Sequence, residues 1–266
     1  MNRNELSAAE RFSRNAQIEP LFGSSNGAVA DVLALGDKYR NRAPELTTDD
    51  QAAILKMHND ARVRYGLAPL KWSNNLAKIA QQWADTCYWG HWKAQRTKQA
   101  LGSDYFPPPR QMGENLSVWF DPGSTMLAGQ YGTQLWLDEE GDYQCGEPIG
   151  GTDWQKCNEA RASGQAPPSN LDCSECKPGT ACGHWTQMMW SGSKEIGCAL
   201  RTCEDGLDSR SWPSRAMGQP NVKYLVCEYS PAGNFTGEVP FSSNKCGGGA
   251  APGAGARGTP QVPPTT

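Results

Sequence analysis

The chain has 266 residues, of which 25 are basic and 28 are acidic, so its net charge is −3. This balance argues against nucleic-acid binding, which usually requires a basic stripe. The sequence contains no run of about 18 apolar residues, so we expect no transmembrane helix. An apolar content of 38%, with 10 Trp, is enough for one hydrophobic core.

Ten cysteines lie between Cys87 and Cys246. Cytosolic proteins rarely carry so many, so we expect disulfide bonds and a secreted, extracellular protein. A thiolate zinc site is the competing interpretation, because Cys173 and Cys176 have CxxC spacing. Cys182 follows without a second CxxC pair, which favours disulfides over zinc.

Composition divides the chain into three parts. Residues 1–45 are polar and weakly patterned, and we expect an N-terminal extension there. Residues 242–266 are rich in Gly, Ala and Pro and cannot bury enough apolar surface to offset their ordering entropy, so they predict a flexible tail. The folded unit is therefore 46–241. The first residues contain no apolar signal-peptide core, so we expect a signal peptide to have been removed, with export by another route as the alternative.

The first half of the folded unit is predicted to be helical. Residues 48–51 read as a capping box, and the helix that follows ends at Gly66, a residue type favoured just after helices. Ser73 predicts the start of a second helix, and a third follows Pro122. The inward faces are expected at helical spacing: Ile54, His58, Ala61 and Tyr65; Leu76, Ala80, Trp83 and Cys87; Ala128, Tyr131, Leu135 and Glu139.

The second half is predicted to be strands. Residues 188–190, 195–201 and 222–229 are short apolar runs separated by Gly, Ser and Pro, whereas residues 113–120 fit either a strand or an irregular segment. Helices followed by strands indicate an α+β fold, with helices packed on an antiparallel sheet.

Four polar side chains lie in settings that suggest a site. His58 and Glu139 are on inward helix faces, Glu114 lies in the apolar segment GENLS, and His184 follows a Cys-Gly pair. A buried carboxylate must be paired, hydrogen-bonded or protonated. Two imidazoles and two carboxylates gathered in one cleft would satisfy one another and could hold a divalent metal ion.

Four segments, in this order, resemble the CAP superfamily: HNDARVRYGLAPLKW, GENLS, CGHWTQMMW and YLVCEYSPAGNFTGE. This superfamily, defined by the SCP domain, includes cysteine-rich secretory proteins, insect antigen five allergens and plant pathogenesis-related class-one proteins. The resemblance covers about residues 47–241, with an insertion at about 145–175 that we expect to overhang the site. It implies an α-β-α sandwich with a central antiparallel sheet, crosslinked by disulfides.

The resemblance also implies a His/Glu tetrad, which we assign to His58, Glu114, Glu139 and His184. Glu140 is the alternative to Glu139 if the helix is rotated. Family members bind zinc or another divalent cation at two histidines, here His58 and His184, although a hydrogen-bonded tetrad would need no cofactor. His91 matches a family histidine that looks structural.

Three functions follow from the resemblance. The first is binding of a sterol or fatty acid, or of an extracellular protein receptor, in defence or virulence. Candidate ligand-binding aromatics are Tyr88, Trp89, Trp92, Tyr105, Phe106, Trp119 and Phe120. The second is release of a signalling peptide, residues 231–241, which otherwise form a turn that closes the sandwich. The third is a metal-dependent peptidase, which is disfavoured because no motif pairs a Ser or Cys nucleophile with a His.

By resemblance, the expected disulfides are Cys87–Cys203 and Cys198–Cys227, and a short Cys176–Cys182 bridge would order the loop before His184. The pairing of the remaining four cysteines, Cys145, Cys157, Cys173 and Cys246, stays open. Asn115 and Asn234 begin N-glycosylation sequons. Asn234 is the better candidate, because Asn115 is next to Glu114 and is expected to be enclosed.

Overall fold

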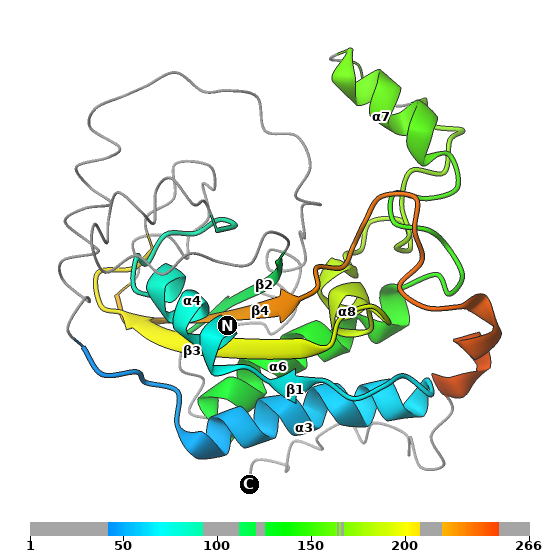
Figure 1. Cartoon of the computed structure of the whole chain (residues 1–266). Coiled ribbons are helices and arrows are strands. Elements are labelled where there is room, and N and C mark those ends of the chain that lie inside the picture. Colours follow the sequence, from blue (N-terminus) through cyan, green and yellow to red (C-terminus); the bar gives the residue numbers. More distant parts are fainter. Residues whose placement is uncertain are drawn as a thin grey trace, which may run out of the picture.

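The computed structural model describes residues 42–92, 112–120, 126–163, 165, 168–207 and 220–249. Its elements follow in chain order (Figure 1): α3 (Thr48–Arg64), β1 (Lys71–Trp72), α4 (Asn74–Ala84), β2 (Gly113–Trp119), α6 (Ala128–Leu137), the 3-10 helix η2 (Asp138–Asp142), α7 (Trp154–Ala162), α8 (Gly183–Met188), β3 (Glu195–Cys203), β4 (Val222–Ser230) and the 3-10 helix η3 (Ser243–Gly249). The predicted order of helices before the longer strands is confirmed, except that β2 comes between helices.

The central sheet has four strands in the order β1-β3-β4-β2. The three longer strands are antiparallel, as predicted. The two-residue strand β1 instead runs parallel to β3, so the sheet is mixed. This corrects the expectation of a purely antiparallel sheet, because a long crossover that includes α4, β2, α6, α7 and α8 separates β1 from β3 in the chain.

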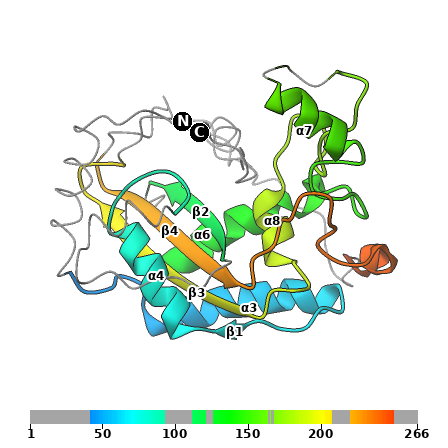
Figure 2. The same cartoon turned by 45° about the horizontal axis from the view of Figure 1, so that its top comes forward.

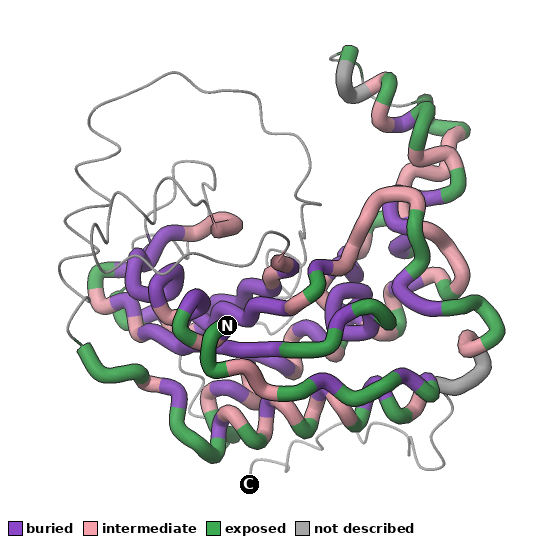
Figure 3. The backbone as a smooth tube through the Cα atoms, in the orientation of Figure 1, coloured by how far each residue is buried: buried purple, intermediate pink, exposed green. Residues whose placement is uncertain are grey.

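Helices cover both faces of the sheet, which gives the predicted α-β-α sandwich (Figures 1 and 2). Alternate residues of β4 pack into two separate hydrophobic clusters, one on each face of the sheet. Leu225 and Tyr229 pack with residues of α3 and α6, whereas Tyr224 and Val226 pack with residues of α4. This alternation is what the two-residue period of a strand requires. The sheet is accordingly buried on both faces (Figure 3).

The ends of the first two helices are close to prediction. The capping box of α3 joins Thr47 and Asp50, one residue earlier than expected. Gly66 adopts a φ of +59°, the left-handed conformation that glycine tolerates best after a helix. Ser73 is the N-cap of α4 but makes no capping hydrogen bond through its side chain.

The buried face of α6 differs from the predicted stripe. Its buried residues are Gly129, Gly132, Thr133 and Trp136, whereas the predicted Tyr131 and Leu135 are only half-buried. A Cβ at Gly132 would lie 2.7 Å from the Leu225 side chain, so this glycine lets the helix approach β4 closely. The regular periodicity favoured large apolar residues and therefore missed a contact made through small ones.

The prediction of a strand at 188–190 is wrong. Met188 is the last residue of α8, and Met189 and Trp190 follow in the turn that leads to β3. All three residues are buried. A short apolar run fits a buried helix as well as a strand, so its periodicity could not distinguish them.

All ten cysteines form disulfides. The structure contains the two bridges expected from the resemblance, Cys87–Cys203 and Cys198–Cys227, and the short Cys176–Cys182 bridge that was expected before His184. The pairs left open are Cys145–Cys246 and Cys157–Cys173. Cys246 lies in η3, so the first residues of the predicted tail are attached to the folded unit by a covalent bond.

The insertion contains α7, which projects beyond α8 and away from the sheet (Figures 1 and 2). The Cys157–Cys173 bridge joins α7 to the irregular chain that follows it. Asp153 and Asp172 accept backbone hydrogen bonds across it, from Asp172 and Thr152 respectively. The segment is therefore braced by its own contacts.

Candidate functional site

The first part of the site is a hydrogen-bonded pair of Glu139 of η2 and His184 of α8. The carboxylate Oε1 lies 2.6 Å from the imidazole Nδ1, and Oε2 accepts the backbone N–H groups of His184 and Trp185. Glu139 is 3% exposed. It thus supplies the cap that the N-cap residue of α8, Cys182, does not provide.

Glu140, the alternative to Glu139, lies elsewhere. It forms a salt bridge with Arg64 and accepts a hydrogen bond from the Tyr65 hydroxyl. Burial, followed by this hydrogen bond and the Glu140 charge, raises the pKa of Tyr65 to about 12. The change from α6 to the 3-10 turn η2 directs Glu139, not Glu140, towards His184.

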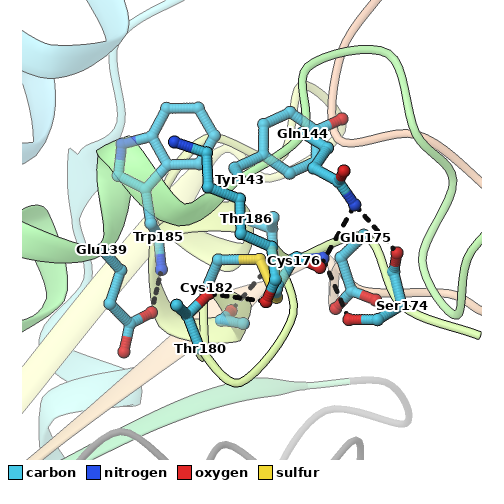
Figure 4. The surroundings of a disulfide bond; sticks show 12 residues. Glu139, Tyr143, Gln144, Ser174, Glu175, Cys176, Thr180, Cys182, Trp185 and Thr186 are labelled. Carbon is cyan, nitrogen blue, oxygen red and sulfur yellow. Dashed lines mark hydrogen bonds between the residues drawn. A yellow bond between two sulfur atoms is a disulfide. The ribbon is translucent and has the colours of Figure 1, made fainter.

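The Cys176–Cys182 disulfide lies directly before α8 (Figure 4). On one side of it Glu139 accepts the Trp185 N–H, and on the other Gln144 donates to the carbonyl oxygens of Ser174 and Cys176. The loop that leads into α8 and His184 is therefore held on both sides of the disulfide. Glu175 lies beside these sulfurs, but a disulfide offers no thiolate to a metal ion.

The second part of the site pairs Glu114, near the start of β2, with His91. Oε1 of Glu114 lies 2.7 Å from Nδ1 of His91, and the same carboxylate accepts the backbone N–H of Trp92. The Glu114 side chain is 6% exposed and the His91 side chain 39%. Each carboxylate of the predicted tetrad is therefore paired with a histidine, but the partner of Glu114 is His91 and not His58.

The structure places His58 in the core and not at either carboxylate. Its Nδ1 lies 2.8 Å from the Ile54 carbonyl oxygen, which can only accept, so Nδ1 carries the proton. Its Nε2 lies 2.8 Å from the Tyr229 hydroxyl. Burial, with a smaller contribution from the Arg62 charge, lowers the pKa of His58 to about 4. The neutral ring uses both nitrogens within the protein, which corrects its assignment to the tetrad and as a metal ligand.

Consecutive residues of β2 connect the two histidine–carboxylate pairs. Glu114 holds His91, and the next residue, Asn115, donates from Nδ2 to the carbonyl oxygen of His184. Trp136 of α6 stacks on the His184 ring, with centroids 6.0 Å apart. Glu114, Glu139 and His184 of the predicted tetrad thus each belong to a histidine–carboxylate pair, and the fourth member of these pairs is His91, not His58.

Sequence reasoning missed His91, Asn115 and Tyr229 as contributors to this region. Helical periodicity correctly turned His58 inward, but it does not distinguish a core position from a site. No pattern in the segment around His91 marks it as a partner of a residue 23 positions away. The register of β2 against β4, which joins Asn115 to Cys227 and thus places Tyr229 nearby, also cannot be read from the sequence.

The two sequons are engaged in the fold. Asn115 is 1% exposed, as expected. Asn234 is half-buried: its Nδ2 donates to the Gly183 carbonyl oxygen, and its Oδ1 accepts from the Thr186 hydroxyl. Asn234 thus joins the turn after β4 to the helix of His184. Because its side-chain amide is used in these hydrogen bonds, it is a weaker candidate for glycosylation than its sequon alone indicates.

The segment 231–241 is also anchored. Phe241 is 2% exposed and packs against Tyr65, Tyr143 and Trp185. The N–H of Gly233 donates to the Gln187 side chain. These contacts support the simpler interpretation, a turn and core anchor that closes the sandwich.

The candidate ligand-binding aromatics fall into three groups. Tyr88 and Trp119 are buried in the core. Trp89, Trp92 and Phe120 are half-buried at the margin of the core beneath α4. Tyr105 and Phe106 lie outside the described residues.

Comparison with known proteins agrees with this architecture. The model of the cysteine-rich secretory protein family, CAP, matches residues 55–229. Peptidase inhibitor 15 of Mus musculus is 32% identical over 234 residues, which cover 83% of this chain and 72% of that protein. The Homo sapiens counterpart is 34% identical over 209 residues, and the match covers 74% of this chain and 63% of that protein, so the chain spans less than two thirds of its length.

Two solved structures match part of the chain. NaASP2, solved with Zn2+, is 18% identical with a TM-score of 0.46, and the match covers 76% of this chain and 90% of that chain. BmVAL-1 is 23% identical with a TM-score of 0.45, and the match covers 75% of this chain and 85% of that chain. Within the described ranges, every helix is too short or too polar to cross a bilayer. From its sequence match and its disulfide-crosslinked sandwich, this chain belongs to the cysteine-rich secretory protein (CAP) family.

Proposed function

We propose that this chain is an extracellular binding protein that holds a divalent cation with the imidazoles of His91 and His184. Its five disulfides and its family support an oxidising, extracellular environment. The proposal replaces His58 with His91 as a ligand, because His58 uses both ring nitrogens in the core.

One observation carries the proposal: each of the two imidazoles has a carboxylate at Nδ1. The pairs are His91 with Glu114 and His184 with Glu139. A histidine that binds a metal ion usually donates its other N–H to a carboxylate, which fixes the tautomer and makes the ligand nitrogen more basic. Here the proton belongs on Nδ1, which leaves the lone pair on Nε2. Zn2+ fits this donor set, with water completing its shell.

Hydrolysis is not part of the proposal. A metal-dependent peptidase needs a general base that is available to activate water. Glu139 already accepts three N–H groups, and Glu114 accepts those of His91 and Trp92. Both carboxylates therefore serve to orient the imidazoles.

Isothermal titration calorimetry with ZnCl2 tests the metal site. The His91→Ala/His184→Ala double variant should lose zinc binding. Glu140→Gln is the matched control, because it alters the neighbouring acid that contacts Arg64 and Tyr65, and it should bind zinc like the wild type. Equal zinc binding by the double variant and the wild type would reject the proposal.

A sterol or fatty acid is the second candidate ligand. The supporting observation is the half-buried row of Trp89, Trp92 and Phe120 at the margin of the core, next in sequence to His91. Apolar side chains that are only partly covered are suited to contact an apolar ligand. Binding of radiolabelled cholesterol and palmitate to the purified protein, compared with Trp89→Ala/Phe120→Ala, measures this directly. Retention of neither lipid by the wild type would leave an extracellular protein receptor as the alternative partner.

A further inference from the structure

Glu228, on β4, is a buried carboxyl group that the histidine–carboxylate site does not include. It is 0% exposed, and neither Oε atom accepts a hydrogen bond from a donor in the described part of the chain. A buried carboxylate normally accepts several hydrogen bonds or pairs with a cation, because an isolated buried charge is very costly. The described residues give Glu228 neither form of compensation.

The polar group next to Glu228 is another carboxyl. Glu114 and Glu228 lie directly opposite one another on β2 and β4, so their side chains leave the sheet on the same face. The two carboxyl groups are close enough for the negative charge of Glu114 to raise the pKa of Glu228. Two adjacent carboxylates repel each other, whereas one proton between them makes a strong charge-assisted hydrogen bond.

The elements packed around Glu228 supply no compensating charge. The buried residues of α4, which covers this face, are all uncharged: Leu76, Ile79, Ala80, Gln82, Trp83 and Ala84. β3 places Gly197 opposite Glu228. The charged residues of β3 on the same face are Glu195, which is exposed, and Arg201, which pairs with Asp85 and Glu45.

Three other titratable groups bear on the pair. His91 faces Glu114 from outside, and Tyr224 and Tyr229 belong to the same strand as Glu228. Burial, and then the negative charge of Glu114, raises the pKa of Glu228 well above its ordinary value. Burial is likewise the main reason that the pKa values of both tyrosines are raised, and for Tyr224 the negative charge of Glu114 adds to it.

We propose that Glu228 carries a proton at neutral pH and donates it to Glu114, so that Glu228, Glu114 and His91 form one hydrogen-bonded chain. Glu228 is then a positioning residue. It binds the Glu114 carboxylate from the interior of the sandwich, while His91 and the Trp92 N–H bind it from the other side. This chain exists whether or not His91 binds a metal ion, so the proposal does not depend on zinc.

The first test compares the pH dependence of stability in the wild type and in Glu228→Gln. Glutamine keeps the shape and a donor but cannot ionise. Below the ordinary glutamate pKa of about 4.3, both the folded and the unfolded wild type hold the proton. At higher pH the unfolded chain releases it and the folded chain does not, so wild-type stability falls relative to the variant.

The melting temperature of Glu228→Gln, minus that of the wild type, should therefore rise steadily between about pH 5 and about pH 8. Glu195→Gln, at an exposed position of the neighbouring strand, is the matched control and should show a constant difference. A constant difference for Glu228→Gln would overturn the proposal, because it would mean that Glu228 ionises equally in the folded and unfolded chains.

NMR gives a second, independent readout. With glutamate labelled by 13C at the carboxyl carbon, the resonance that disappears in Glu228→Gln should keep the chemical shift of a neutral acid at about pH 7. The midpoint of the His91 titration should be the same in Glu228→Gln as in the wild type, because no charge is removed, and should move in Glu228→Leu, which removes the donor. A lower His91 midpoint in Glu228→Gln would show that Glu228 is ionised and contradict the proposal. Zinc binding, measured separately, does not enter either test.

Discussion

The two faces of the sheet bury titratable groups in different ways. Towards α3, His58, Arg62 and Tyr229 all make hydrogen bonds within the protein. Towards α4, the described residues donate no hydrogen bond to the carboxyl of Glu228 and form none with the hydroxyl of Tyr224. His58, Arg62 and Tyr229 on the first face are thus satisfied within the fold, whereas Glu228 and Tyr224 on the second accept no hydrogen bond from the described residues. The second face also carries Glu114, which belongs to the candidate site.

The largest expected effect concerns Arg62, which is 0% exposed. Its guanidinium donates to the carbonyl oxygens of Ala68, Met188, Trp190 and Ser193. Arg62→Met would keep the apolar stem and leave these buried acceptors unpaired, at about 1–3 kcal/mol each. We expect a loss on the order of 4 kcal/mol or more in urea unfolding. Arg64→Met, on the partly exposed side of α3, should cost about 0–1 kcal/mol, and equal losses would contradict this account.

Acidification should destabilise the α3 side through His58. The folded chain lowers the pKa of His58 from 6.5 to about 4. The unfolded chain therefore binds a proton first as the pH falls, and the stability that neutral His58 contributes is lost between these two values. This amounts to about 3 kcal/mol, at about 1.4 kcal/mol per pKa unit. Urea unfolding as a function of pH should show this loss in the wild type but not in His58→Gln; identical pH profiles would show that His58 is not held neutral.

Two tyrosines of the same strand offer a matched comparison of the faces. Tyr229→Phe removes the hydroxyl that serves His58 and Asn115, and should cost about 1–3 kcal/mol because buried partners lose a hydrogen bond. Tyr224→Phe removes a buried hydroxyl that makes no hydrogen bond with the described residues, and should be neutral or slightly stabilising. Chemical denaturation of both variants measures the difference. A larger loss for Tyr224→Phe would reverse the comparison.

The smallest expected effect is on the outer surface of α3. Lys56 and Asp60 form an exposed pair four residues apart. Lys56→Ala should change the free energy of unfolding by less than about 0.5 kcal/mol, because solvent screens such pairs. A loss as large as that of Tyr229→Phe would mean that polar contacts of α3 matter irrespective of burial.

Much of the fold could be predicted because local patterns agree with it. The cap of α3, Gly66 after its end and the short apolar runs of β3 and β4 are all readable in the sequence. The parallel pairing of β1 and the glycine-lined face of α6 were not, because both depend on contacts between distant segments. The Cys145–Cys246 disulfide could not be predicted either, because no local rule joins cysteines 101 residues apart.

Part of the site could also be predicted from local patterns. Glu114, Glu139 and His184 lie in distinctive segments, and the structure places all three in histidine–carboxylate pairs. His58 was misassigned because periodicity reveals that a side chain faces inward but not what it meets there. Glu228 was missed because its significance comes from the register that sets it opposite Glu114.

The most direct test of the central claim is to follow all three histidines by NMR while zinc is added to the wild-type protein. The imidazole resonances of His91 and His184 should shift together and saturate together, while those of His58, whose nitrogens bind Ile54 and Tyr229, should stay unchanged. A shift confined to His58, or saturation without any change at His91, would contradict the assignment of the site.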